Sequence, residues 1–230
     1  MRPGPRRSLT HAEILGTAFD LLESKGFDAV SVRGVAGALG LTPTAMYTYY
    51  ASKDALLHGM AEQVLGGLGA DGTDAATAAP TGDPVDPART RIIGLASGLR
   101  ARLVQRPGLV GVLLATSLDG PNARRFDEAL LAAFTDAGLG PLEAGRAAHA
   151  VRVHVLGAVA FDAAEADRAV EPDSGPEPAP TSSDTLWDDL ESFPLGDSAR
   201  AAGDDAGERF AWGLARLLDG VLAAAPAVTA

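Results

Sequence analysis

The 230-residue chain contains no cysteine and few aromatic residues. Without cysteine, neither a disulfide nor a thiolate metal site can form. Phe, Trp and Tyr together make up 5% of the residues, whereas apolar residues as a whole make up 47%. The chain can therefore build a large core, and its composition favours closely packed helices over a sheet.

Long hydrophobic runs are also absent. The longest uncharged apolar stretch, residues 107–118, is shorter than the roughly 20 residues that a transmembrane helix needs. The first seven residues, Met-Arg-Pro-Gly-Pro-Arg-Arg, are not followed by the apolar segment that is typical of a secretory signal. We therefore expect a soluble, cytoplasmic protein with no membrane partner.

Positive charge is scarce, since 19 Lys and Arg residues stand against 30 Asp and Glu residues, a net charge of −11. The charge is unevenly distributed. Residues 1–60 contain six basic and five acidic side chains, a net charge of +1, which leaves −12 for the remainder. Because like charges repel a polyanion, any contact with nucleic acid is expected at the N-terminal end. This asymmetry permits DNA binding without demonstrating it.

Helical periodicity dominates the sequence and no strand-like alternation recurs, so we predict an all-α fold. Residues 1–9 are predicted to form a basic arm, residues 10–58 a small helical head, and residues 59–230 a larger helical domain. Within the larger domain, residues 66–88 and 169–206 are rich in turn-forming or acidic residues and are predicted to be partly loop or disordered.

Four helix starts can be located in the head. Thr10–Glu13 has the sequence of a capping box, in which side chains and backbone N–H groups satisfy one another. Ser31, Thr42 and Ser52 are typical N-cap residues, and Pro43 suits the first position of a helix because its missing N–H is not needed there. These caps predict helices that begin just after each of them.

The segment 36–46 has the spacing of a helix-turn-helix: a small residue, a glycine four residues later and an apolar residue six residues after that. Ala36 lies where two crossing helices must approach closely, Gly40 lies at the turn, and Met46 plugs the core between the helices. Met46 and Tyr50 are four residues apart and are predicted to share the buried face. The opposite face, with its hydroxyls and aromatic ring, suits contact with phosphates and base edges.

The segment from Gly26 to Leu57 resembles the DNA-binding domain of the TetR family of transcriptional regulators. The later stretch from Arg106 through Gly120-Pro121-Asn122 to Gly138 is similar to the tetracycline-repressor type of C-terminal domain. The resemblance implies a homodimer with N-terminal helix-turn-helix heads and a C-terminal ligand-binding and dimerisation domain. It further implies a repressor that a small-molecule effector releases from a double-stranded DNA operator. Two reading heads related by a dyad predict a near-palindromic operator.

The same resemblance assigns individual residues to the DNA contact. It implies that DNA is contacted by Arg33 near the start of the second helix and by the start of the recognition helix, Thr42, Pro43, Thr44 and Ala45. It also implies that three positions contact phosphates: Tyr47, Tyr49 and Lys53. Tyr49 and Thr48 depart from the commonest family pattern, which leaves the operator sequence open. Taken singly, the tyrosines are also typical of partly buried aromatics, Lys53 of a solvated charge, and Arg33 of a partner for Asp28.

The effector site is expected among the helices between residues 88 and 168. Its candidate residues are Leu103, Leu113, Phe126, Phe134, His154 and Phe161. Apolar residues at helical spacing are also typical of a plain core, and a lone histidine is also typical of a hydrogen-bonded interior residue. His149 and His154 are five residues apart, a spacing that does not place two ligands on one helix face, so no metal site is predicted.

Dimerisation is predicted through two helices, residues 141–168 and 206–224, that would form a four-helix arrangement with their copies. The residues assigned to this contact are Ala147, Val151, Val155, Leu214, Leu218 and Val221. The alternative is that these helices only close the core of a single chain.

The chain carries no pattern for catalysis or for a cofactor. It has no nucleophile elbow, no His-Glu metal motif and no pair of carboxylates at a recognisable spacing. A helical small-molecule-binding protein or an enzyme with an incidental helix-turn-helix head is the alternative function. Within the regulator class, the sequence does not separate a repressor from an activator.

Overall fold

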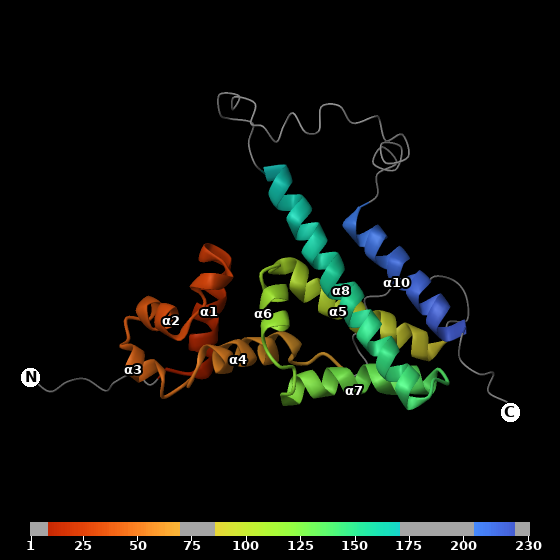
Figure 1. Ribbon diagram of the computed structural model, residues 1–230, viewed down its shortest axis with the longest axis horizontal. Helices are drawn as coiled ribbons and strands as arrows, with labels where there is room; N and C mark the ends of the chain where they lie inside the picture. Colours follow the sequence, from red (N-terminus) through yellow and green to blue (C-terminus); the bar gives the residue numbers. More distant parts are fainter. Residues whose placement is uncertain (1–8, 70–85, 171–204, 224–230) are drawn as a thin grey trace, which may run out of the picture.

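The computed structural model describes residues 9–69, 86–170 and 205–223, and every regular element in these ranges is a helix (Figure 1). The prediction of an all-α fold is confirmed. Most of the predicted arm 1–9 and of the predicted loops 66–88 and 169–206 lies outside the described residues. No helix in the described ranges is long and apolar enough to cross a bilayer. The helices are α1 (His11–Lys25), η1 (Phe27–Ala29), α2 (Val32–Ala38), α3 (Pro43–Met46), α4 (Lys53–Leu65), α5 (Pro87–Gln105), α6 (Leu109–Ala115), α7 (Pro121–Asp136), α8 (Pro141–Val170) and α10 (Ala206–Ala223).

The head consists of α1, α2, α3 and the first half of α4, and each of these helices begins at the predicted cap. Thr10 and Glu13 form the full capping box, with Glu13 N donating to Thr10 Oγ1 at 3.2 Å and Thr10 N donating to Glu13 Oε2 at 2.8 Å. The hydroxyls of Ser31, Thr42 and Ser52 each accept a backbone N–H three residues later, at 3.0, 3.3 and 3.0 Å. The apolar faces meet in a common core that includes Ile14, Ala18, Phe19, Val35, Ala36, Met46, Leu56 and Met60.

Helix α4 belongs to both parts of the molecule. Its first half contributes Leu56 and Leu57 to the head, and its second half buries Val64 and Leu65. It contacts α1 on the head side and α6 and α7 on the body side, as Figure 1 shows. Helix α4 therefore links the head to the body.

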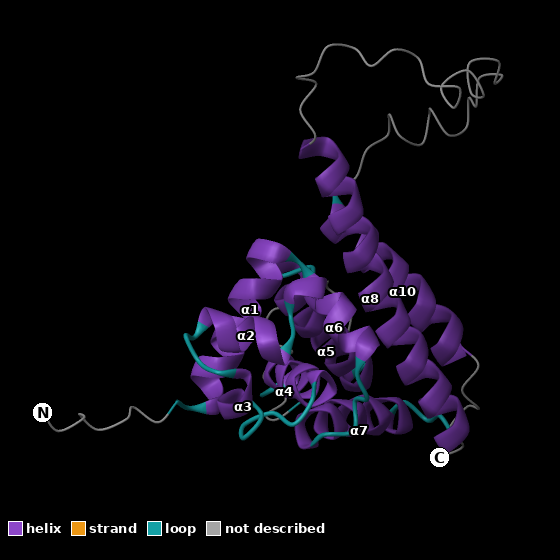
Figure 2. Cartoon of the chain, turned by 60° about the vertical axis from the view of Figure 1, so that its left-hand side comes forward, coloured by secondary structure: helices purple, strands orange, loops and turns teal. Residues whose placement is uncertain are grey.

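The body is built from α5, α7 and α8, which pack against one another, with α10 lying along α8. Figure 2 shows α8 and α10 side by side on the flank of the molecule, away from α2 and α3. The core of the body includes Ile92, Leu99, Leu103, Phe126, Leu130, Phe134, Val151, Val155, Leu214 and Leu218.

The face predicted for dimerisation is used inside one chain. Ala147, Val151, Val155, Leu214 and Leu218 are buried between α8, α10 and their neighbours, and Val221 packs against the same cluster. The assignment of these residues to a dimer contact is wrong, because the apolar stripes of α8 and α10 pack against each other and against α5 and α7. The outward faces of the two helices are a different set of residues.

Candidate nucleic-acid interface and internal cavity

The turn between α2 and α3 has the geometry that its sequence predicts. Gly40 adopts a φ of +67°, which is sterically cheap only for glycine. The N–H of Leu41 donates to Ala36 O at 2.8 Å and the N–H of Gly40 donates to Gly37 O at 3.2 Å. These two bonds close α2 in a Schellman motif. Ala36 and Met46 are both buried at the helix crossing, so the predicted role of each is confirmed.

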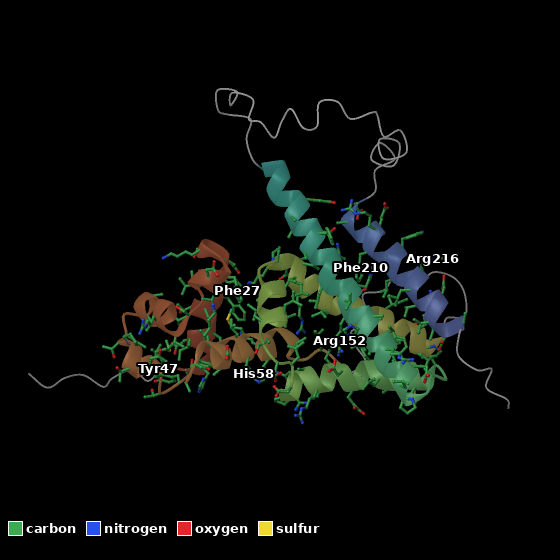
Figure 3. The ribbon with its side chains drawn as sticks, viewed as in Figure 1. Phe27, Tyr47, His58, Arg152, Phe210 and Arg216 are labelled. Atoms are coloured by element: carbon green, nitrogen blue, oxygen red, sulfur yellow. The ribbon has the colours of Figure 1, made fainter. Side chains whose placement is uncertain are left out.

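Helix α3 presents a polar face to solvent. Thr44 and Thr48 are exposed, and the side chain of Tyr47 is 46% exposed, whereas Met46 and Tyr50 are buried behind them. Tyr47 lies at the end of the head that is farthest from α8 and α10 (Figure 3). The Thr48 hydroxyl already donates to Ala45 O at 2.7 Å, whereas the exposed Thr44 and the Tyr47 ring are available to a partner without any rearrangement of the head.

The two cations assigned to this surface differ in their surroundings. Arg33 is exposed on α2, and in the described part of the chain no salt bridge involves it, so the alternative pairing with Asp28 is absent. Lys53 is half-buried, with its Nζ 4.7 Å from the centroid of the Phe27 ring. This cation–π contact limits the positions that the ammonium group can take. Arg33 is consequently the freer of the two side chains.

An aromatic cluster joins the start of α1 to the end of α3. The ring of His11 makes edge-on contacts with Tyr49 and Tyr50, with centroid distances of 5.9 and 5.2 Å. Burial raises the pKa of the Tyr50 phenol above its usual value of 10.0. A Cβ added at Gly59 of α4 would lie 3.0 Å from the Tyr50 ring, so this glycine allows the ring to pack on α4. His11 thereby brings Tyr49 into contact with the start of α1.

The head contacts the body where α5 ends and α6 begins. Arg106 Nε lies 2.5 Å from Glu23 Oε1, and the guanidinium of Arg106 lies 5.3 Å from the centroid of the Phe19 ring. A Cβ added at Gly108 would come within 3.1 Å of the Leu22 side chain, so the absence of a side chain at Gly108 allows Leu22 to pack there. An open groove of about 340 Å³ lies at this junction.

A second connection runs from α4 to the start of α7, whose N-cap is Gly120 and therefore lacks a side-chain cap. The carboxylate of Glu62 on α4 caps the start of α7 instead. Its Oε2 accepts the N–H of Asn122 at 2.8 Å and its Oε1 accepts the N–H of Ala123 at 3.0 Å. The side-chain amide of Asn122 donates in return to Glu62 O at 2.9 Å. A charged acceptor at a helix N-terminus is favourable both as a hydrogen-bond partner and through the helix dipole.

A small, partly open cavity lies between α4, α5, α6, α7 and α8. Its volume is about 20 Å³, and its lining is Leu65, Leu99, Leu113, Leu118, Ala123, Phe126, Asp127, Arg152 and Leu156. Asp127 of α7 and Arg152 of α8 form an ion pair there, through Oδ1 and Nη1. All other residues of the lining are apolar.

Comparison with known families accounts for this arrangement of a helical head on a helical body. The model of the tetracyclin repressor-like C-terminal domain matches residues 82–225, and the model of the bacterial regulatory proteins of the tetR family matches residues 14–60. The first of these matches covers more than half of the chain. The chain belongs to the TetR family.

Individual relatives agree with the family models. A solved structure of a possible TetR family transcriptional regulator from Streptomyces coelicolor is 31% identical, with a TM-score of 0.71 over 93% of this chain and 99% of that one. The S. coelicolor TetR family protein ActR, solved in complex with actinorhodin, shares the fold at 21% identity, with a TM-score of 0.68 over 95% of this chain and 99% of that one. An HTH-type transcriptional regulator from Saccharopolyspora erythraea is 28% identical over 157 residues, which are 67% of this chain and 61% of that relative. This match thus spans less than two thirds of that relative's length.

Within this TetR-family body, the residues predicted for the effector site separate into three groups. Leu113 and Phe126 line the cavity. Leu103 and Phe134 are completely buried but belong to the surrounding core and not to the lining. The structure does not bring Phe161 to the cavity, because its side chain on α8 is 71% exposed.

His154 also lies away from the cavity, between α8 and α10. Its Nε2 is 3.0 Å from Phe210 O, and its ring stacks on the Phe210 ring with a centroid distance of 5.1 Å. A Cβ added at Gly213 would meet the same imidazole at 2.6 Å. The environment of His154 is thus that of a hydrogen-bonded interior residue, the alternative that the sequence left open, and its contacts hold α10 on α8 of the TetR fold.

Sequence reasoning missed the ion pair of Asp127 with Arg152, the cap that Glu62 supplies to α7, and the contact of His11 with Tyr49. Each of these joins residues on different helices, so no helical periodicity reveals it. The one local signal was the unusual helix start Gly-Pro-Asn at residue 120, which provides no cap of its own and so requires one from elsewhere.

Proposed function

We propose that this TetR-family protein is a homodimeric, DNA-binding transcriptional regulator, a repressor that a small-molecule effector releases from its operator. The observation that carries the proposal is the exposed face of α2 and α3. It combines a cation, hydroxyls and an aromatic ring, and no acidic residue occurs anywhere between Ser31 and Lys53. Such a surface is attractive to phosphates and offers side chains that can read base edges.

Two kinds of DNA contact are proposed for the assigned residues. Arg33 and Thr44, with the start of the recognition helix at 42–45, read base edges. Tyr47, Tyr49 and Lys53 contact phosphates, which are the same in every sequence. The exposure of Arg33, Thr44 and Tyr47 supports their contact with DNA. Tyr49 contacts His11 and Lys53 contacts Phe27, which supports contacts that position the protein on the DNA backbone rather than contacts that read bases.

The test begins with selection of a binding duplex from a random pool, followed by titration of that duplex and of a scrambled one at several salt concentrations. Lys53→Ala should weaken both duplexes alike and lower the salt slope by about one unit. Arg33→Ala should reduce the preference for the selected duplex by about tenfold or more, as expected for a base contact worth roughly 1–3 kcal/mol.

Lys25→Ala is the matched control, because Lys25 is an exposed cation that lies outside the proposed DNA-binding surface. It lies at the end of α1, where the nearby Leu22 contacts Gly108 of the body. Its binding should equal that of the parent. If the parent selects no duplex, the proposed function is wrong. If Lys53→Ala abolishes discrimination while Arg33→Ala leaves it intact, the roles are reversed.

The homodimer is proposed to form through the outward face of α8 and α10. Exposed apolar side chains gather there: Leu142, Val153 and Phe161 on α8, with Trp212 on α10, of which Phe161 and Trp212 are 71% and 69% exposed. Large exposed apolar side chains on adjacent helices are typical of a protein–protein interface. A contact about a dyad would bury the same residues on both copies. It would also hold the two DNA-binding heads at a fixed separation on the operator.

Sedimentation of the Phe161→Arg, Trp212→Arg double variant tests the dimer. The parent should sediment as a dimer at micromolar concentration and the variant as a folded monomer, because two buried guanidinium groups per chain would lack partners. Leu114→Arg is the control, since Leu114 is equally exposed but lies on α6. A monomeric parent would contradict the proposed interface.

The effector is proposed to bind at the internal cavity. Its present volume of about 20 Å³ is far below the roughly 300–1,000 Å³ of typical ligand pockets, so a ligand must part the surrounding helices. Because α4 joins those helices to the head, such a change reaches the DNA-binding surface. The effect on operator affinity is limited by the ligand's preference for the opened state, typically about 1–3 kcal/mol.

A further inference from the structure

A single ion pair lies in an otherwise apolar cavity lining. Asp127 and Arg152 face it from α7 and α8, and seven aliphatic or aromatic side chains form the rest of the wall. In Figure 3 Arg152 lies just above the ribbon of α7. The two side chains are 28% and 35% exposed, and an ion pair that solvent screens to this extent contributes little to stability. The pair therefore calls for an explanation other than stability.

The guanidinium of Arg152 has N–H donors beyond the one that bonds to Asp127. Among the described residues its hydrogen bond is that of Nη1 to Asp127, and its side chain is 28% exposed, so the other N–H groups of the planar fork are open to a further acceptor. Arginine cannot lose its proton, and its fork matches a carboxylate with two parallel hydrogen bonds. This makes Arg152 the natural anchor for an acidic group that enters the cavity.

Opening the cavity would separate α7 from α8 at this ion pair. A ligand that carries a carboxylate could replace Asp127 as the partner of Arg152, so that the cation would stay paired while α7 is released. The freed Asp127 side chain, already 35% exposed, would be left to water and to the exposed Arg124 three residues earlier on α7. A cationic ligand would instead take Asp127 and leave Arg152 unpaired beside apolar groups.

We infer that the effector is an amphipathic organic acid, whose carboxylate pairs with Arg152 in place of Asp127 while its apolar part lies among the leucines and Phe126. This inference rests on the proposed function, since it names the chemistry of the ligand that the regulator senses. It also gives the ligand a means of separating α7 from α8.

Calorimetric titration of the full chain with matched probes tests the charge preference. An octyl chain and a naphthalene ring are each used with a carboxylate, with a neutral carboxamide and with an ammonium group: octanoate, octanamide and octylammonium, and 2-naphthoate, 2-naphthamide and 2-naphthylmethylammonium. On at least one scaffold the acid should bind about tenfold or more tightly than the amide, the difference expected for one charge-assisted pair, and the ammonium should bind more weakly than both. Equal binding of acid and amide, tighter binding of the ammonium, or no binding of either acid would overturn the inference.

Two substitutions should move the affinity for the bound acid in opposite directions. Arg152→Gln should weaken it about tenfold or more, and Arg152→Lys should weaken it less, because the charge remains without the fork. Asp127→Asn should strengthen it, because the acid no longer has to displace a carboxylate. A misfolded variant cannot bind more tightly, so this gain separates the inference from a loss of structure. A weaker affinity in Asp127→Asn would overturn the assignment of Arg152 as the anchor.

Arg91→Gln is the matched control, because Arg91 of α5 makes a comparable ion pair with Asp136 of α7 at 2.6 Å but lies outside the cavity. Its affinity for the acid should equal that of the parent. Failure of the proposed function has a separate readout, since the selected duplex is titrated without any acid. Acid binding that follows the pattern above but leaves DNA affinity unchanged supports the ligand class and contradicts only the release of the operator.

Discussion

Glu62→Ala should destabilise the protein although the residue belongs to no core. In the parent, both carboxylate oxygens accept backbone N–H groups at the start of α7, at 2.8 and 3.0 Å. Alanine would leave the N–H groups of Asn122 and Ala123 without these acceptors, in a partly buried position that water reaches poorly. Gly120 offers no side chain that can substitute for the missing cap.

The size of the effect follows from the two lost bonds. Replacing an N-cap side chain by alanine costs about 0.5–2 kcal/mol, and a hydrogen bond to a charged group contributes about 1.5–3 kcal/mol. Because partial exposure lets water compensate in part, we expect a loss of about 2–3 kcal/mol in the free energy of unfolding, or about 5–10 °C in Tm for a chain of this length. Glu62→Gln should lose about half as much, since one acceptor oxygen remains.

Urea and thermal denaturation followed by circular dichroism measure the change. Gln63→Ala is the control, because Gln63 is the exposed neighbour on α4, and its unfolding free energy should stay within about 0.5 kcal/mol of the parent. If Glu62→Ala is as stable as Gln63→Ala, the carboxylate does not cap α7, and the link that we describe between α4 and the body is not an energetic one.

Three further outcomes are expected. Gly40→Ala should cost about 1–2 kcal/mol in unfolding free energy, because φ at this residue is +67°, and Gly37→Ala, where φ is negative, should not. Phe134→Ala should cost about 3–5 kcal/mol, because a completely buried ring is removed; a loss below 1 kcal/mol would contradict its place in the core. Because burial raises the pKa of Tyr50 above 10.0, the folded state binds its proton more tightly than the unfolded state does. The stability of the parent should therefore fall as pH rises above 10, and that of Tyr50→Phe should fall less, as urea titrations from pH 8 to 11 can show.

The sequence alone determined the features that depend on a few consecutive residues. The capping box at Thr10, the caps at Ser31, Thr42 and Ser52, and the turn at Gly40 are all present as predicted, because each depends on local backbone geometry and hydrogen bonds. The spacing that places Met46 inside and Thr44 outside is likewise a property of a single helix and its turn. The helical head and its exposed face were therefore predictable.

Tertiary structure decided which surface each helix meets. An apolar stripe shows that a helix face will be buried but not what will cover it, so the stripes of α8 and α10 were assigned to a second copy when they meet within one chain. The same limit applied to Phe161, which helical spacing placed near the cavity and which faces outward. Asp127 and Arg152 are 25 residues apart on different helices, and only the packing of α7 against α8 brings their charges together beside the cavity.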